Sequence, residues 1–152
     1  MPTPFLCVDK IGTRTDYTLV DGSNPLPMNR TSDYPMGAIP IGASSGNVAA
    51  TAAVATLAAV AGKTMFITGF EVTSAGATVA AVVTVTIVGA VGGTMAYTYI
   101  AAAGATLSNT NLIVQFTRAI PATAVNIPIV VTLPSLGIGN TNATVVCHGY
   151  YM

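Results

Sequence analysis

Residues 48–152 are built from short runs of β-branched and aromatic residues separated by glycine, serine and asparagine. The clearest run covers residues 82–88, where Val83, Val85 and Ile87 alternate with threonines. A period of two is typical of a strand that buries one face, whereas a helix repeats about every 3.6 residues. The pattern therefore predicts a strand with these three side chains directed inward.

Residues 63–73 predict another strand, which contains a glycine. Phe66, Phe70 and Val72 would share one face of this strand. Gly69 has no side chain to pack, and a glycine inside a strand often marks a β-bulge. We therefore expect a bulge at Gly69.

The remaining runs complete an all-β pattern. Gly92 and Gly93 predict a hairpin turn. The strands expected after this turn cover residues 94–100, 112–117, 127–133 and 143–150. With the segment before residue 63, the chain would have seven or eight strands. The simplest closure for that number is an antiparallel β-sandwich that is jelly-roll-like.

The alanine-rich segment over residues 47–62 permits two interpretations. Alanine has the highest helix propensity, and Val54, Leu57 and Val60 would form a thin helical stripe. The segment has no charged residue for the opposite face of such a helix, and it leads directly into the strand that begins near residue 63. These features favour extended structure.

The N-terminal part of the chain differs from the rest in its prolines and charges. Proline removes a backbone donor and fixes φ, so prolines at 2, 4, 25, 27, 35 and 40 exclude long helices and central strands there. Short strands over residues 5–8 and 17–20 are compatible with these prolines. We therefore divide the chain into an extended Pro-rich N-terminal arm, residues 1–43, and a β-sandwich body, residues 44–152.

Most of the charged side chains lie in the arm. Only Lys63, Glu71 and Arg118 follow residue 33. Such a segregated distribution predicts that the arm and the body meet different surroundings. We expect the arm to dock on a partner, and an arm that wraps its own domain remains the alternative. The candidate docking residues are Asp9, Lys10, Arg14, Arg30 and Asp33.

Composition predicts self-association of the body. The chain is 52% hydrophobic and only 7% charged, so neutral side chains must form most of its surface. A neutral surface offers little repulsion between copies. We expect Met95, Tyr97 and Tyr99, which share one strand face, to form an oligomer interface. The zero net charge gives no electrostatic attraction for a phosphate backbone, so direct nucleic-acid binding is not expected.

The best catalytic candidate is the sequence Gly-Ala-Ser-Ser-Gly at residues 42–46, which matches the G-x-S-x-G nucleophile elbow. Ser44 would be the nucleophile, and His148 with Glu71 or Asp33 would complete a triad. That elbow requires a parallel sheet with crossover helices, which the strand pattern does not predict. We therefore expect a small-residue loop there and no enzyme activity.

Neither a metal site nor a membrane segment is expected. Cys7 and Cys147 are far apart in the sequence and lack metal-ligand spacing, so we expect no metal and no cofactor. Residues 75–91 are uncharged, but they alternate like strands and contain glycine. The first residues lack the basic and apolar regions of a secretory signal, which predicts synthesis in the cytoplasm.

Three segments of the body resemble a known group of proteins. They are GKTMFITGFEV at residues 62–72, IVVTLPSLGIGNTNA at 129–143 and VVCHGY at 145–150. In this order, with neutral Ala/Val/Thr strands between them, they resemble small virion proteins of tailed bacteriophages. The resemblance covers residues 44–152 and not the arm. It implies a capsid decoration or cement protein on the capsid exterior, a β-sandwich that is usually a homotrimer and clamps adjacent subunits of the major capsid protein.

A binding module is the alternative function. A fibre or tail domain of a phage could recognise host carbohydrate, since aromatic faces pack on the apolar surfaces of sugars. The residues that would form such a platform are Tyr97, Tyr99, Tyr150 and Tyr151.

Overall fold

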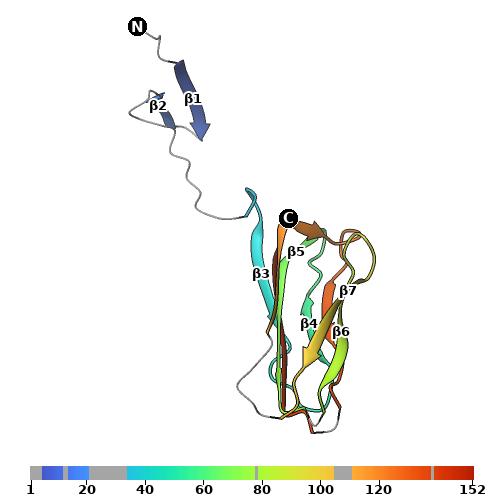
Figure 1. Cartoon of the computed structure of the whole chain (residues 1–152). Helices are drawn as coiled ribbons and strands as arrows, with labels where there is room; N and C mark the ends of the chain where they lie inside the picture. Colours follow the sequence, from blue (N-terminus) through green and yellow to red (C-terminus); the bar gives the residue numbers. More distant parts are fainter. Residues whose placement is uncertain (1–4, 12–13, 21–33, 78, 105–110, 138) are drawn as a thin grey trace. The chain divides into compact units, whose positions relative to one another are not determined.

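The computed structural model describes residues 5–11, 14–20, 34–77, 79–104, 111–137 and 139–152. The chain divides into two compact units, Met1–Asp33 and Tyr34–Met152. In the first unit, β1 (Phe5–Ile11) and β2 (Arg14–Val20) form an antiparallel hairpin (Figure 1). Both strands are longer than the short strands expected from the sequence.

In the described residues of the second unit, eight strands form two four-stranded antiparallel sheets. The first sheet has the order β3-β10-β5-β8, and the second has the order β4-β9-β6-β7. The strands are β3 (Ile39–Ser44), β4 (Ala53–Leu57), β5 (Met65–Ala75), β6 (Ala81–Val88), β7 (Met95–Ala101), β8 (Leu112–Pro121), β9 (Ile129–Leu133) and β10 (Asn142–Tyr151).

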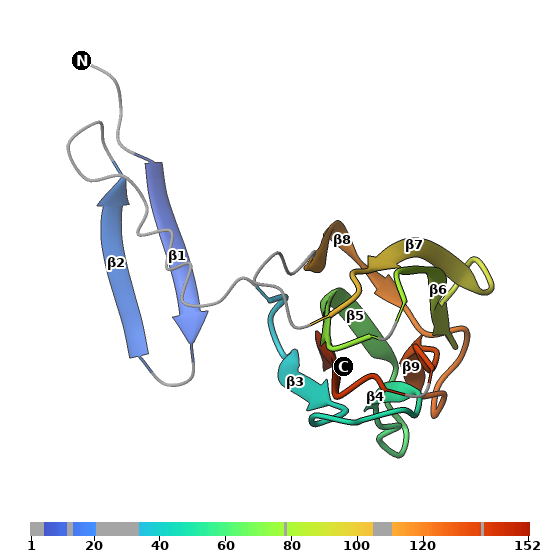
Figure 2. The ribbon, with the colours of Figure 1, turned by 60° about the horizontal axis from the view of Figure 1, so that its bottom comes forward.

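The eight strands pair in a nested order. β6 pairs with β7, β5 with β8, β4 with β9, and β3 with β10, each pair antiparallel. The pairings β5–β10 and β6–β9 then join these four pairs into the two sheets. As a result, β3 and β4 lie at one side of the two-layer body, and β7 and β8 lie at the opposite side (Figure 2).

The core lies between the two sheets, and the period of two explains which side chains enter it. In β4, Ala53, Ala55 and Leu57 are fully buried, whereas Val54 and Thr56 are exposed. In β6, the three predicted apolar positions face the core, since Val85 and Ile87 are fully buried and Val83 packs against them. The alanine-rich segment contains β4, which confirms the extended interpretation. Among the described residues no helix is present, and so none that is long and apolar enough to span a membrane.

The expected bulge in β5 is present, and it corrects one assignment. His148 of β10 pairs with Gly69 and Gly149 pairs with Ile67, so Thr68 is an extra residue in β5. The extra residue reverses which side chains of β5 point to the core: odd-numbered positions face inward before Thr68, and even-numbered positions face inward after it. Ile67 and Phe70 both face the core, and Phe66 lies on the outer face, where its ring stacks on Tyr150 at 4.8 Å. Placing Phe66 on the same face as Phe70 was therefore wrong.

The boundary between the two units lies between Asp33 and Tyr34. Residues 39–43, which the sequence analysis placed in the arm, form most of β3 and pair with β10. Their proline, Pro40, lies opposite Tyr150 on an edge strand, where a missing backbone donor is tolerated. By its hydrogen bonding β3 belongs to the body.

Two glycines that flank His148 should respond differently to an added methyl group. In Gly69→Ala, the new Cβ would approach the Val114 carbonyl oxygen to 2.6 Å, so we expect a loss of roughly 1–3 kcal/mol in the free energy of unfolding. In Gly42→Ala, the nearest atom lies at 3.6 Å, and we expect a change within about 0.5 kcal/mol. Denaturant titration followed by circular dichroism measures both. Equal effects would contradict the assigned register.

Candidate functional site

The predicted docking residues of the arm lie partly within the described chain. Asp9 and Lys10 lie on β1, and Arg14 is the first residue of β2. In the hairpin register, Asp9 is opposite Asp16 and Lys10 is opposite Thr15. Three of the predicted docking residues thus belong to one hairpin, while Arg30 and Asp33 lie outside the described residues.

Met95, Tyr97 and Tyr99 share one face of β7, as predicted, but that face is directed toward the core of the chain itself. Tyr99 is 3% exposed, and its hydroxyl lies 2.7 Å from Ser74 Oγ in a hydrogen bond that links the two sheets. A buried tyrosine needs such a partner for its hydroxyl. Their role in an oligomer interface stays a prediction: Tyr99 is buried within the chain, while Met95 and Tyr97 are only partly buried.

Three aromatic rings span the side of the body where β7 and β8 lie. Phe70 of β5 is fully buried. The Tyr97 ring meets it edge-on from β7, with centroids 5.1 Å apart, and the Phe116 ring lies 6.5 Å away on β8. Since β7 and β8 are edge strands of different sheets, these rings form an apolar link between the sheets at this side.

Burial of the inward face is incomplete at this side. β4, an edge strand at the opposite side, buries its inward side chains fully. On β8 and on the first half of β7, the inward side chains are only partly buried, although they pack against the core; Tyr99 and Ala101 at the end of β7 are buried. We call this region the open side, and it consists of Met95, Tyr97, Leu112, Val114 and Phe116.

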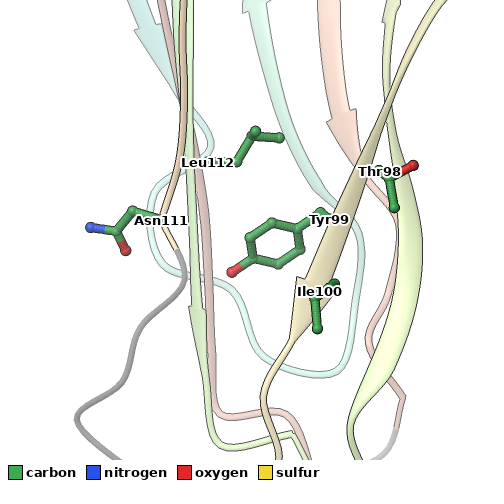
Figure 3. Close-up of a pocket in the computed structure, with 5 residues that line it drawn as sticks. All are labelled: Thr98, Tyr99, Ile100, Asn111 and Leu112. Atoms are coloured by element: carbon green, nitrogen blue, oxygen red, sulfur yellow. The ribbon is translucent and has the colours of Figure 1, made fainter.

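A shallow hollow of about 190 Å³ lies at one end of the open side. Thr98, Tyr99 and Ile100 of β7 line it together with Asn111 and Leu112 at the start of β8. Figure 3 shows the Tyr99 ring extending from β7 toward the β8 side of the hollow. The lining is uncharged, so the hollow suits an apolar or neutral side chain better than an ion.

The outer face of the second sheet is also uncharged. None of its four strands contains an acidic or basic residue. One row across the sheet reads Val54, Thr132, Thr86 and Ala96. The exposed valines and isoleucine of this face are Val54, Val82, Val88 and Ile100. This sheet therefore presents methyl and hydroxyl groups to its surroundings.

The candidate hydrolase residues lie on the first sheet without forming a triad. His148 is exposed on β10 between Gly42 and Gly69, while Ser44 and Glu71 lie opposite Val146, one row away. Ser44 Oγ accepts a hydrogen bond of 3.1 Å from the Gly46 N–H. No hydrogen bond joins Ser44, His148 and Glu71 within the described part of the chain, where Asp33 is not included. The motif lies at the end of an antiparallel edge strand, which differs from a nucleophile elbow.

The tyrosines proposed as a sugar platform are largely covered. Tyr150 is 7% exposed, since Phe66 stacks on it and the Tyr34 ring meets it edge-on at 5.5 Å. This burial raises the pKa of the Tyr150 hydroxyl. Tyr97 and Tyr99 face the core, and Tyr151 packs against it. These four rings do not form an open stacking surface.

Comparison with known proteins found no relative. No protein-family model matches the sequence, and no curated protein matches it.

The sequence did not identify Leu112, Val114 and Phe116 as the side chains of β8 that line the open side. Their alternation along β8 has the period of a strand, so the pattern showed that they share a face. Half-burial depends on β8 being at the edge of its sheet, which only the sheet order reveals.

Cys147 is fully buried on the inward face of β10. Burial raises the pKa of its thiol from 9.0 to about 11, and backbone hydrogen bonds to Ala43 and Leu57 oppose the rise only partly. A buried thiol with a raised pKa is a poor nucleophile, since the thiolate is the reactive form. Among the described residues, no cluster of three His, Cys, Asp or Glu side chains gathers around it or elsewhere.

We expect Cys147 to be nearly inert in the folded protein. In a Cys7→Ser variant it is the remaining thiol. At pH 8 the raised pKa lowers its thiolate fraction about 100-fold relative to an ordinary cysteine, and burial slows its reaction further. Labelling with an aromatic disulfide reagent should be slow in native protein and complete in denaturant. Rapid labelling of the native protein would show that β10 is packed differently.

The same thiol should make stability depend on alkaline pH. Below about pH 9 the thiol is protonated in both the folded and the unfolded chain, so it adds no pH dependence to the free energy of unfolding. Between about pH 9 and 11 the unfolded chain ionises first, so the free energy of unfolding falls. Denaturant titrations at pH 8 and 10.5 measure this fall. The free energy of unfolding should fall less in Cys147→Ala, which lacks the thiol, than in the unaltered chain.

Proposed function

We propose that this chain is a structural protein of a bacteriophage virion, which assembles with copies of itself and decorates the capsid exterior by binding between major capsid subunits. In this proposal it stabilises the capsid and has no enzyme activity or cofactor. It is made in the host cytoplasm and acts as a homotrimer.

The proposal includes the jelly-roll topology. In a jelly roll, eight strands wind as one long folded hairpin, so that the first strand pairs with the last and the innermost two pair with each other. The nested order of β3–β10, β4–β9, β5–β8 and β6–β7 supports this topology. Jelly rolls occur in viral capsid proteins, and also in lectins and cupins, so the topology supports the function only together with the surface.

The observation that carries the proposal is the uncharged surface of the body. Residues 34–152 contain three side chains that are charged at neutral pH, Lys63, Glu71 and Arg118, and the second sheet contains none. Such extended neutral faces are expected to associate, because they lack the charge repulsion that keeps proteins apart. Repeated contacts of this kind suit a shell, where many identical subunits are present.

The N-terminal unit supplies a different surface in this proposal. It holds most of the charged residues of the chain, and β1 and β2 place Asp9, Lys10 and Arg14 on one hairpin. Hydrogen bonds and ion pairs from this unit to major capsid subunits would give the binding its specificity. A protein that binds only the assembled lattice stabilises it by mass action.

Removal of the N-terminal unit should separate docking from self-association. The second unit has its own core, so we expect a chain lacking residues 2–33 to fold and to associate with itself. It should bind capsid particles at least about tenfold more weakly, which corresponds to roughly 1.4 kcal/mol. Co-sedimentation with purified expanded capsids measures this. Retained particle binding would refute the assignment of docking to residues 1–33.

Copy number separates decoration from receptor binding. A decoration protein should be present in hundreds of copies spread over the capsid, whereas a receptor-binding fibre module should be present in a handful of copies. Quantitative gel analysis of purified particles, with labelling to locate the chain by electron microscopy, measures both. A few copies on the tail would contradict the proposal.

A further inference from the structure

Asn140 is a polar residue buried inside the body, two residues before β10 begins. Only 2% of its surface is exposed. Its side-chain amide nitrogen and oxygen are both buried, and neither atom meets a hydrogen-bond partner within the described residues. Buried polar groups in folded proteins almost always have a partner, because without one they lose their hydration and gain nothing in return. The Asn140 amide is therefore a feature of the interior that needs an explanation.

Backbone hydrogen bonds fix the place of Asn140. Its N–H donates to the Gly137 carbonyl oxygen at 3.3 Å, and its carbonyl oxygen accepts from the Ala50 N–H at 3.0 Å. Ala50 lies between β3 and β4 and has a φ of 54°, a left-handed conformation that is unfavourable for a residue with a Cβ. Two connecting segments thus meet at Asn140, and they hold its side chain inside although that side chain gains no bond from the chain there.

Polar side chains close to Asn140 in the sequence already have partners. Ser135 Oγ donates to the Ala50 carbonyl oxygen at 3.0 Å. Thr141 Oγ1 donates to the Ala75 carbonyl oxygen at 3.5 Å. A hydroxyl group has one proton, so neither hydroxyl can also donate to the Asn140 amide oxygen. Turning one of them toward Asn140 would move the missing hydrogen bond to another group and would not remove it.

The chemistry of the amide defines the ligand that would complete it. The Asn140 oxygen accepts hydrogen bonds and its nitrogen donates two, so the ligand must both donate and accept. Water does both, and buried waters commonly make about three hydrogen bonds to polar groups that otherwise lack a partner. We propose that the Asn140 amide binds an internal water molecule at the point where the segment before β10 meets the segment between β3 and β4. This site is independent of the proposed function.

An ion does not fit this site. Glu71, on the outer face of β5, is the last acidic residue of the sequence, so a cation beside Asn140 would be buried without a negative charge. A cation would also leave the amide nitrogen without a partner, because that nitrogen only donates. A buried anion would need a positive charge, whereas Lys63 and Arg118, the basic residues of the body, are exposed.

High-resolution crystallography of the unaltered chain tests the site directly. We expect a density peak at about 2.7–3.2 Å from both Nδ2 and Oδ1 of Asn140, the ordinary range of hydrogen bonds. A peak at about 2.3–2.6 Å from the oxygen, with further oxygen ligands, would identify calcium and overturn the proposal. The absence of any peak, or an amide bonded directly to the chain, would overturn it as well.

Solution NMR of the unaltered chain provides a second test without any substitution. The side-chain amide protons of Asn140 and the backbone amide proton of Ala50 should show cross-relaxation with a water whose residence time is far longer than that of surface water. Contact with short-lived water only would show that this part of the body is open to solvent, and it would contradict an internal site.

Asn140→Leu and Asn142→Leu form a matched pair of variants. Leucine has the branched shape of asparagine without its polar atoms. Asn142 is exposed, and its amide bonds to Asn47 and Thr141 instead. Asn140→Leu should lose the long-lived water and shift the unfolding equilibrium about five- to thirtyfold toward the unfolded chain, because the chain loses the hydrogen bonds that the water made. Asn142→Leu should keep the water.

The sign of the stability change separates a bound water from an amide without a partner. If the amide had no ligand, replacing it with an apolar group of similar shape would stabilise the folded chain. A more stable Asn140→Leu variant, measured by denaturant titration, would therefore refute the site. Loss of the water signal in Asn142→Leu but not in Asn140→Leu would also refute it. If Asn140→Leu does not fold, the crystal and NMR measurements on the unaltered chain decide.

Discussion

Packing of the two sheets across Phe70 is the interaction on which the rest of the body depends. Phe70 is fully buried in the longest strand, and its ring contacts rings from the edge strands of both sheets, Tyr97 on β7 and Phe116 on β8. Burial of an aromatic side chain of this size contributes roughly 1.5–3 kcal/mol. The same contact fixes how closely the two edges approach, and therefore how much of the open side remains exposed.

The bulge at Thr68 places Phe70 in that position. Without the extra residue, β5 would direct the same face inward along its whole length, and Phe66 would lie inside with Phe70. With it, Ile67 and Phe70 both enter the core, and Phe66 joins Tyr150 on the outer face. Gly69 is required there because the Val114 carbonyl oxygen occupies the space of a Cβ. One inserted residue thus supplies both the central core ring and the outer aromatic cluster.

The amino-acid pattern was sufficient for the positions of β6 and β7, because β-branched alternation in residues 82–88 and the glycine pair before β7 act locally. It also predicted a bulge at Gly69, next to the extra residue Thr68, but a pattern of period two cannot show that the bulge moves Phe66 to the outer face. Tyr97 and Tyr99 were correctly placed on one face of their strand, but the sequence did not show that this face packs against the core of the same chain. Which strands are edges follows from long-range pairing, and so the exposure of Val114 and Phe116 could not be predicted.

The scarcity of charge connects the fold to its surroundings. In most soluble proteins, lysine and glutamate cover the outer face of a sheet and protect its edges against association. Here the second sheet uses threonine for its outer polar positions, and its edge strand β7 carries no protecting residue. Threonine keeps each chain hydrated through its hydroxyl but adds no repulsion between chains. A sheet of this kind carries no charge repulsion against a similar surface, which is the property that the proposed repeated assembly requires.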